Sequence, residues 1–389
     1  MRIEFNRNID ALKPSSSIAL MEKARMMSVN ERDIISLAGG EPDFDTPPRA
    51  SFAGIQSICR GQTHYTSGRG MNSLRERIAR KLNEENNIAC DVENILMTPG
   101  GKFAIYVVLR TLLNGGDEVI ILDPSWVSYA PIVIASGGVP VRHTLKFTDN
   151  YRIDAQDLRK SISSKSKAII INSPNNPTGR MLSPDEVRAI AQVAHDNDML
   201  ILSDEIYEKI IYDQNRHISI ASDSSIANQV VTVNGFSKFA AMTGWRIGYL
   251  AANKILVDKV YALYQHVATC ISEFVQEAAL VAIDCDSEIE EMRKNYQERR
   301  NFFVKALNDI PGVICRFPEG AFYAWAMIDK DGLSSEDVSD FLLEKVKVVV
   351  VPGTAYGGEE GSVRMSFASP MSDLQQAADR IREAMKQMR

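Results

Sequence analysis

The sequence predicts an α/β protein in which a mostly parallel, seven-stranded sheet flanked by helices forms a large domain, with a smaller α+β domain beside it. Three observations support this prediction. With 389 residues, the chain is too long for one ordinary domain. Through its middle part, short apolar runs alternate with helical patterns, which is typical of a parallel sheet covered by helices. The C-terminal part changes to a strand–turn–strand pattern followed by further helices and strands.

Seven apolar runs predict the strands of the large sheet. Each is short, rich in β-branched residues and bounded by Gly, Pro, Asn or Asp. Amphipathic segments such as 73–87 and 103–113 predict the helices between them. Ligands bind at the carboxyl ends of the strands in such sheets, so the residues after each run are candidates for chemistry. The runs are 93–98, 116–124, 140–145, 167–174, 199–205, 230–235 and 246–252.

The smaller domain is predicted from the two ends of the chain. Residues 18–27 have a helical pattern, and a short strand at 34–38 breaks at Gly39-Gly40. A helical region from about 255 to 310 leads into the C-terminal part. We expect the N-terminal segment to pack with that part, which places the large domain at 46–288 and the smaller one at 1–45 plus 289–389. The C-terminal elements expected are a strand–turn–strand at 311–328, helices at 334–346 and 372–388, and strands at 346–353 and 362–368.

Composition narrows the class of function. The formal net charge of −6 gives no basic face for a nucleic acid. The chain has no run of about 18 apolar residues, and its start lacks the apolar segment of a signal peptide, so neither a membrane partner nor export is expected. Five scattered cysteines without a CxxC pair, and five histidines without metal spacing, predict neither disulfides nor a metal site. A reducing cytoplasm fits this pattern.

Lys238 lies at the end of one predicted strand. The run 230–235 stops at a turn, Ser237 and Lys238 follow it, and Arg246 precedes the next run. A lysine that is fixed and partly desolvated can be neutral near pH 7 and form a Schiff base with a phosphorylated aldehyde. A hydroxyl and a guanidinium can bind the phosphate. A lone Ser-Lys pair is more often an ordinary surface feature, so this interpretation depends on the rest of the chain.

Further polar clusters follow other strands. Gly100 and Gly101 lie between a strand and a helix, where free amide groups can bind an anion or simply allow close packing. A rigid loop at 172–179, an acidic pair at 204–205 and a strand arginine at 364 have ordinary explanations as a turn, a cap and a solvated edge. Their joint occurrence with the lysine in this order is improbable by chance.

These clusters belong to a set of motifs that spans nearly the whole chain. The set resembles the fold type I aminotransferases of class I/II, which use pyridoxal 5′-phosphate, and within them the prokaryotic-type aspartate aminotransferase branch. The resemblance implies that the large domain binds the cofactor. The matching motifs are KPSSSIA, GGEPDFDTP, YTSGRGMNSLRE, TPGGKFAI, DPSWVSY, NSPNNPTG, SDEIY, NGFSKFAAMTGWRIGY, PEGAFY, VPGTAYG and GSVRMSFA.

The resemblance implies a role for each residue around the cofactor ring. Lys238 resembles the Schiff-base lysine, which afterwards moves the proton of the substrate. Asp204 resembles the partner that keeps the pyridinium nitrogen protonated. Tyr207 and Asn176 resemble the donors to the ring 3′-oxygen, and Trp126 resembles the aromatic plate stacked on the ring.

The phosphate site and the assembly are implied in the same way. The amides of Gly101 and Lys102, with Ser237 and Arg246, resemble the phosphate cup. Tyr65 resembles a tyrosine that reaches the phosphate from a neighbouring subunit, which implies a homodimer with shared active sites.

Substrate binding is implied by a third group. Arg364 resembles the arginine that binds the substrate α-carboxylate with two hydrogen bonds. Gly40 and Asn176 are expected to help bind the same carboxylate, and Trp126 to contact the substrate. Lys102 and Ser17 resemble the residues that meet the distal carboxylate of a dicarboxylic substrate. The expected substrates are therefore aspartate or glutamate, with 2-oxoglutarate or oxaloacetate as acceptor. Lys102 has an alternative explanation as a plain phosphate contact or a solvated side chain.

Three alternatives to an aspartate aminotransferase remain open. The amino donor could be aromatic, alanine, or glutamate acting on prephenate. A pyridoxal-phosphate-dependent Cβ–S lyase could use the same scaffold. A sensor domain behind a DNA-binding helix-turn-helix is disfavoured, because the motifs begin near residue 13.

Overall fold

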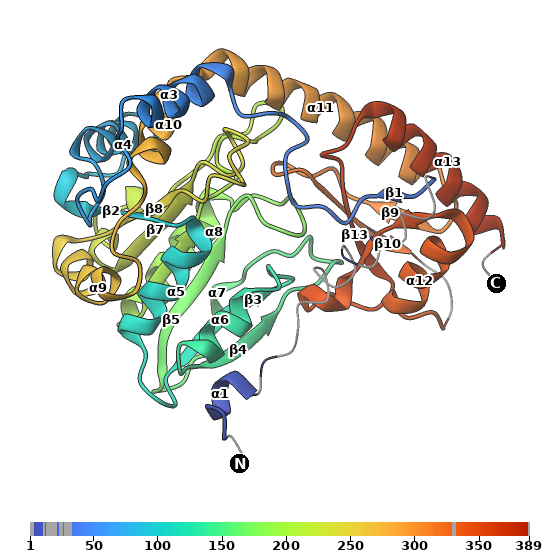
Figure 1. The fold of residues 1–389 in the computed structure, drawn as a ribbon. Helices are drawn as coiled ribbons and strands as arrows, with labels where there is room; N and C mark the ends of the chain where they lie inside the picture. The colour runs from blue at the N-terminus through green and yellow to red at the C-terminus, as the bar shows by residue number, and fades with distance from the viewer. Residues whose placement is uncertain are drawn as a thin grey trace.

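The computed structural model describes residues 4–10, 12, 22, 26, 33–328 and 332–387. The two larger β-sheets lie side by side, each with its own helices, and the long helix α11 (Asp286–Asn308) runs along one side toward the smaller of them (Figure 1). The short helix α1 (Arg7–Asp10) precedes both sheets. Among the described residues, no helix is long and apolar enough to cross a membrane.

The large sheet has seven strands in the order β2-β8-β7-β6-β5-β3-β4. The five strands from β7 to β4 are parallel to one another, while β8 is antiparallel to both of its neighbours. All seven predicted runs form strands of this sheet, so the predicted fold class is confirmed. The strands are β2 (Ile95–Thr98), β3 (Glu118–Asp123), β4 (Val139–Thr144), β5 (Ser166–Asn172), β6 (Leu200–Asp204), β7 (Val230–Gly235) and β8 (Gly248–Ala251).

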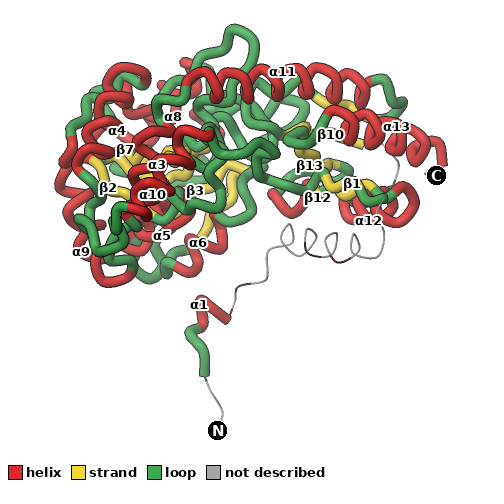
Figure 2. The backbone as a smooth tube through the Cα atoms, turned by 45° about the horizontal axis from the view of Figure 1, so that its top comes forward, coloured by secondary structure: helices red, strands yellow, loops and turns green. Residues whose placement is uncertain are grey.

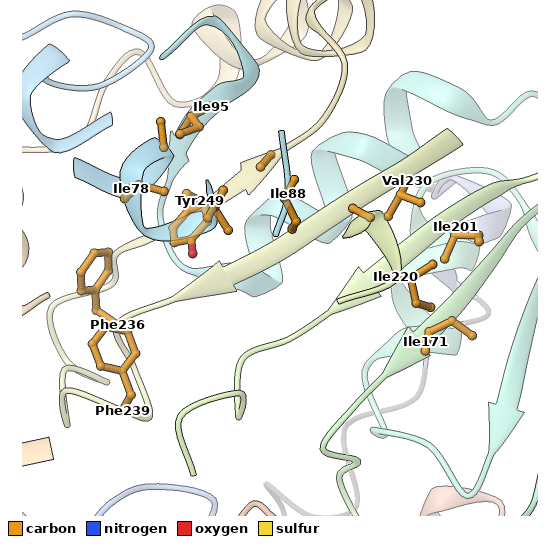
Figure 3. Packing of buried hydrophobic residues seen from close by; sticks show 14 of the residues in the cluster. Ile78, Ile88, Ile95, Ile171, Ile201, Ile220, Val230, Phe236, Phe239 and Tyr249 are labelled. Carbon is orange, nitrogen blue, oxygen red and sulfur yellow. The ribbon is translucent and has the colours of Figure 1, made fainter. Parts of the chain in front are cut away.

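Helices cover both faces of this sheet because its side chains alternate between two apolar cores. On β3, Val119 and Ile121 face one core while Ile120 and Leu122 face the other, as the two-residue period of a strand requires. Figure 3 shows one of these cores, where Ile171 and Ile201 pack beside residues from other elements. The helices are α3 (Pro48–Cys59), α4 (Asn72–Glu85), α5 (Gly101–Leu112), α6 (Tyr129–Ala135), α7 (Ala155–Arg159), α8 (Pro184–Asp196), α9 (Lys254–Val267) and α10 (Glu273–Ala282).

The smaller unit joins the two ends of the chain. Its four-stranded antiparallel sheet has the order β12-β13-β10-β9, and β1 (Ile35–Ser36) pairs in parallel with β11 (Val348–Val349). The N-terminal segment therefore packs with the C-terminal part, as predicted. Figures 1 and 2 show α11 and α13 side by side along this unit. Its other elements are β9 (Val313–Cys315), β10 (Tyr323–Ile328), α12 (Ser335–Val346), β12 (Val351–Pro352), β13 (Ser362–Ser366) and α13 (Met371–Gln387).

Two differences from the predicted elements have local causes. The single strand expected at 346–353 is divided into β11 and β12, which pair with different partners, β1 and β13. Its first residue, Val346, is the last residue of α12, and Lys347 caps that helix with a left-handed backbone of φ 60°. The helix expected at 18–27 lies mostly outside the described residues. The division at 46–288 remains a prediction.

Candidate active site

A cavity of about 480 Å³ opens at the carboxyl ends of the parallel strands and reaches the smaller sheet. This volume is in the range of about 300–1,000 Å³ that holds small-molecule ligands. Residues from distant parts of the sequence line it, including the loop after β1, the start of α5 and strand β13. It brings together all but two of the residues predicted to form the site, namely Gly40, Gly101, Lys102, Trp126, Asn176, Asp204, Tyr207, Ser237, Lys238, Arg246 and Arg364.

Lys238 lies in the turn that follows β7, and its amine reaches the N-terminal loop. Its Nζ donates a hydrogen bond of 2.5 Å to the carbonyl oxygen of Gly40. Burial lowers the pKa of this amine to about 8; Arg364 and Arg246 act in the same direction, while Glu41 opposes them. Deprotonation near neutral pH is what a nucleophilic lysine needs.

Asp204 is the last residue of β6, and its carboxylate is buried at the floor of the cavity. Its Oδ2 accepts a hydrogen bond of 2.7 Å from the hydroxyl of Tyr129. Asn172, at the same level on β5, donates from Nδ2 to the Asp204 carbonyl oxygen at 2.8 Å. Burial raises the pKa of the Asp204 carboxyl to about 6, although the Tyr129 hydrogen bond opposes that shift. A cation bound beside this carboxylate would relieve the cost of burying it.

An anion site forms where β2 turns into α5. Gly100 precedes the helix with φ of 81°, and the first two residues of α5, Gly101 and Lys102, line the cavity. The cavity therefore meets the N-terminus of a helix, which favours an anion. A Cβ atom at Gly100 would lie 2.9 Å from Nη2 of Arg246, which shows how closely the guanidinium approaches the turn. Ser237 lines the same cavity. Amide groups, a hydroxyl and a guanidinium together are a donor set for phosphate.

Arg364 projects from β13 and is 4 % exposed. Its Nη2 donates to the carbonyl oxygen of Ala38 at 2.7 Å, and its Nη1 donates to Oδ1 of Asn176 at 3.2 Å. Its Nε is buried and has no hydrogen-bond partner in the described part of the chain. The guanidinium lies over the rings of Tyr323 and Tyr356, at 4.4 and 4.9 Å. An arginine held with spare donors can bind a carboxylate.

Trp126 and Lys102 lie together on the wall of the cavity. The Lys102 ammonium is 4.9 Å from the centre of the Trp126 ring. The same ring makes an edge contact with Tyr129, at a centroid distance of 5.3 Å, and this contact fixes its orientation. An aromatic face and a cation thus face the same space.

Three cavity residues were missed by the sequence analysis. They are Tyr129, Tyr323 and Glu41. Tyr129 donates a hydrogen bond to Asp204, the Tyr323 hydroxyl lies 2.8 Å from that of Tyr207, and Glu41 raises the pKa of Lys238. All three belong to motifs that were recognised, DPSWVSY, PEGAFY and GGEPDFDTP. Their contacts were not apparent because they depend on which side of each loop faces the cavity.

Two predicted site residues are not in the cavity. Tyr65 is 86 % exposed and lies outside it. Ser17 lies outside the described residues.

The residues present fit pyridoxal 5′-phosphate. The turn before α5 offers donors for a phosphate, the buried Asp204 can pair with a protonated ring nitrogen, and Lys238 offers an amine for the aldehyde. The unpartnered Arg364 Nε leaves capacity for a substrate carboxylate. Each group of the cofactor therefore meets a side chain of matching chemistry.

Comparisons with known proteins agree with this chemistry. Residues 32–381 match the family described as aminotransferase class I and II. An aspartate aminotransferase of Musicola paradisiaca is 40 % identical over 95 % of this chain and 94 % of that protein. An aromatic-amino-acid aminotransferase 2 of Thermococcus litoralis is 41 % identical over 91 % and 92 %. The Thermus thermophilus aspartate aminotransferase solved with maleate is 34 % identical and superposes with a TM-score of 0.94, covering 99 % of this chain and 100 % of that one.

Proposed function

Because the chain belongs to the class I and II aminotransferases, and is thus an enzyme that transfers amino groups, we propose that it binds pyridoxal 5′-phosphate around Lys238 and prefers acidic amino acids. The family uses this cofactor. The observation that carries the proposal is that the Lys238 amine and the Asp204 carboxylate line one cavity together with a phosphate-type donor set.

The bound cofactor supplies an electron sink for the electrons released when the substrate Cα loses a proton. Asp204 holds the ring nitrogen in its protonated form through its negative charge. Lys238 has an amine that is neutral above about pH 8, so it can accept the proton that the substrate Cα releases and hold it on Nζ. Arg364 holds the α-carboxylate, which orients the Cα–H bond toward Lys238.

Tyr207 and Asn176 form the remaining polar wall. The Tyr207 hydroxyl is buried and lies 2.8 Å from the hydroxyl of Tyr323. The backbone of Asn176 is held in place because its N–H donates to Oδ1 of Asn172 at 2.7 Å. We assign to both the donation of hydrogen bonds to the ring oxygen, because their positions are fixed before any ligand binds. Such prior ordering lowers the entropic cost of binding.

An acidic amino donor is favoured by the charge of the cavity. Lys102, Lys238, Arg246 and Arg364 line it, against the carboxylates of Glu41 and Asp204. Lys102 is the cation left for a distal carboxylate once the others hold the cofactor and the α-carboxylate. The Thermus relative with maleate, a dicarboxylate, supports this choice. Ser17 keeps its proposed distal contact, and 2-oxoglutarate or oxaloacetate is the proposed acceptor.

An aromatic donor is the second candidate. The Thermococcus relative is an aromatic-amino-acid aminotransferase at 41 % identity. The Trp126 ring on the cavity wall could stack against an aromatic substrate as readily as against a cofactor ring. We therefore propose that the choice between an acidic and an aromatic donor in this chain depends on Lys102.

We also propose a homodimer in which Tyr65 reaches the phosphate of the neighbouring subunit. The 86 % exposed Tyr65 follows α3, whose apolar side chains Phe52, Ile55 and Ile58 are exposed as well. Apolar patches of this kind are typical of subunit interfaces. A cytoplasmic location remains our prediction from the cysteine content.

One experiment tests the proposed function. Aspartate, glutamate, alanine, phenylalanine and tyrosine are compared as donors by kcat/KM, with 2-oxoglutarate and oxaloacetate as acceptors. We expect the acidic donors to be fastest and product to require an acceptor. Keto-acid product formed without any acceptor would instead identify a lyase, and a preference for phenylalanine would establish the aromatic alternative.

A further inference from the structure

A second cluster of polar side chains lies buried next to the cavity without lining it. Its members come from α4, the segment after β6, the loop before η2 (Ile220–Ser222) and the end of β7. We call it the buried polar cluster, and it consists of Lys81, Asn86, Glu205, Glu208, His217, Ser219 and Asn234.

Glu208 is the centre of one half of the cluster. It forms an ion pair with Lys81, which is only 4 % exposed. It accepts further hydrogen bonds from Nδ2 of Asn86 at 2.7 Å and from Nδ2 of Asn234 at 2.6 Å. Burial works to raise the pKa of the Glu208 carboxyl, but Lys81 and His217 outweigh it and lower the pKa to about 2. This carboxylate is therefore held in its charged form.

Glu205 is the centre of the other half. It accepts from the hydroxyls of Ser203 and Ser219 at 2.9 and 2.6 Å, and its Oε2 lies 2.8 Å from Nε2 of His217. Burial would lower the pKa of His217, but Glu205 and Glu208 raise it. Asn86 joins the halves, because its Nδ2 also donates to Ser219 at 2.8 Å.

The carboxylates of this cluster are already balanced by cations of the protein. Glu205, Glu208 and His217 offer three ligand atoms within 4.8 Å of one another, a spacing that suits a metal ion. The Lys81 ammonium, however, contacts Oε1 of Glu208, to which Asn234 also donates, and Asn86 donates to Oε2 of the same carboxylate. Ser219 donates to Oε2 of Glu205. Burial raises the pKa of the Tyr249 hydroxyl on β8, and the charges of Glu208 and Glu205 add to this shift. A lysine in this place supplies the positive charge that a metal would otherwise bring.

The position of the cluster in the sequence links it to the active site. Glu205 directly follows Asp204, and Glu208 directly follows Tyr207, so one short segment contributes side chains both to the cavity and to the cluster. The third link is Asn234, whose Oδ1 accepts from the amide of Gly235 at 2.7 Å in the turn that leads to Lys238. The cluster thus anchors the backbone beside three residues of the site.

We propose that the buried polar cluster positions Asp204, Tyr207 and Lys238 for the cofactor, with Lys81 and Ser219 as positioning residues that touch neither cofactor nor substrate. This inference rests on the proposed function. The charged pair Lys81–Glu208 ties α4 to the segment after β6, and the hydroxyl of Ser219 ties the loop before η2 to Glu205. If either the Lys81–Glu208 ion pair or the hydrogen bond from Ser219 to Glu205 is lost, the side chains of Asp204 and Tyr207 shift while the fold persists. Small displacements of such groups weaken binding strongly.

The chain provides a matched control for Lys81. Lys209 forms an exposed ion pair with Glu85, which also joins α4 to the segment after β6 but lies outside the buried cluster. Lys81→Met and Lys209→Met therefore each remove one positive charge from an ion pair that joins the same two parts of the chain. We expect Lys81→Met to raise the Kd for pyridoxal 5′-phosphate about 10- to 100-fold, as outer partners of ligand-binding side chains do, and to shift the pH midpoint of the visible absorbance. Lys209→Met should leave both unchanged.

Ser219→Ala is the milder second variant, and it decides the question if Lys81→Met does not fold. Its control is Ser222→Ala, since the Ser222 hydroxyl donates only to the Ser219 carbonyl oxygen, at 2.7 Å. We expect Ser219→Ala to raise the Kd several-fold and to move the same pH midpoint, with Ser222→Ala unchanged.

The measurements are the Kd, the absorbance midpoint and the Tm of the ligand-free protein. A lower Tm with an unchanged Kd and midpoint in both variants would show a purely structural cluster and would overturn the inference alone. A wild-type protein that gains no visible absorbance with the cofactor would overturn the proposed function, and the inference with it.

Discussion

At the scale of single residues, burial shifts the pKa values of both Lys238 and Asp204 in the direction that favours the neutral form. Burial lowers the pKa of the lysine to about 8 and raises that of the aspartic acid to about 6. Both shifts cost the ligand-free protein stability, because each charged form is disfavoured in the buried cavity. The cofactor brings the opposite charges, so its binding is expected to recover this cost.

The most direct prediction concerns Lys238→Ala. Without the amine, no Schiff base to the aldehyde can form, so visible absorbance from the linked cofactor and turnover should both be lost. Absorbance spectra and a coupled transamination assay measure these effects. Transamination near the wild-type rate would contradict the role proposed for Lys238.

The pKa of Lys238 predicts a pH dependence for cofactor capture. With a pKa of about 8 in place of 10.5, the neutral fraction of the amine rises about tenfold from pH 7 and levels off above pH 8 to 9. The rate at which ligand-free protein captures the aldehyde should follow this curve in stopped-flow absorbance. A rate that still climbs beyond pH 10 would mean that the amine keeps its ordinary pKa.

Lys102→Ala tests donor specificity. Loss of its ammonium should reduce kcat/KM for aspartate by roughly 10- to 100-fold, since hydrogen bonds to charged groups contribute about 1.5–3 kcal/mol. Alanine and phenylalanine lack a distal carboxylate and should change little. An equal loss for all donors would support the alternative in which Lys102 contacts the phosphate.

At the scale of elements, the turn between β2 and α5 limits what can replace Gly100. Its φ of 81° strains any other residue, and a Cβ atom there would lie 2.9 Å from Arg246 Nη2. Gly100→Ala should therefore weaken cofactor binding by about tenfold, from roughly 1–3 kcal/mol of backbone strain. The loss should be smaller for unphosphorylated pyridoxal.

Gly115→Ala is the control for that change. Gly115 follows α5 at its other end, and a Cβ atom there would have no neighbour within 4 Å. The Kd of this variant should equal that of the wild type. A similar loss in both variants would show that the effect comes from general destabilisation and not from the anion site.

The elements also show what sequence reasoning can and cannot predict. The strands were predicted because runs buried on both faces are continuously apolar. The direction of β8 was not, because β7 and β8 have the same composition whether they pair parallel or antiparallel. Asn176, Asp204 and Lys238 could be expected in one cavity because they follow strand ends of one sheet. Gly40 and Arg364 belong to the N-terminal loop and to β13, so their place in the cavity was expected only from the resemblance. The hydrogen bonds of Tyr129 and Tyr323 depend on rotamers and packing, which a sequence does not display.

At the scale of the whole molecule, the proposed dimer makes a prediction that a single chain cannot satisfy. We expect a mass twice the 43.2 kDa of one chain in sedimentation experiments. Chains with Tyr65→Ala and chains with Lys238→Ala should each be impaired. When the two are unfolded and refolded together, mixed dimers contain one site with an intact lysine and a partner's intact Tyr65, so activity should return.

Activity that stays at the mean of the two separate variants would indicate that Tyr65 acts within its own chain. Wild-type chains refolded alone provide the control for losses during the procedure. A monomeric mass at all concentrations would contradict the shared site directly.

The position of β13 so late in the chain has a consequence for synthesis. Arg364 follows Lys238 by 126 residues, which a ribosome needs roughly 6–25 s to add at about 5–20 residues per second. During that interval the nascent polypeptide already contains the lysine proposed to bind the cofactor aldehyde, but not the arginine proposed to bind the substrate carboxylate. A message truncated in this stretch would therefore encode a chain that keeps the proposed Schiff-base lysine and lacks the arginine proposed to hold the substrate.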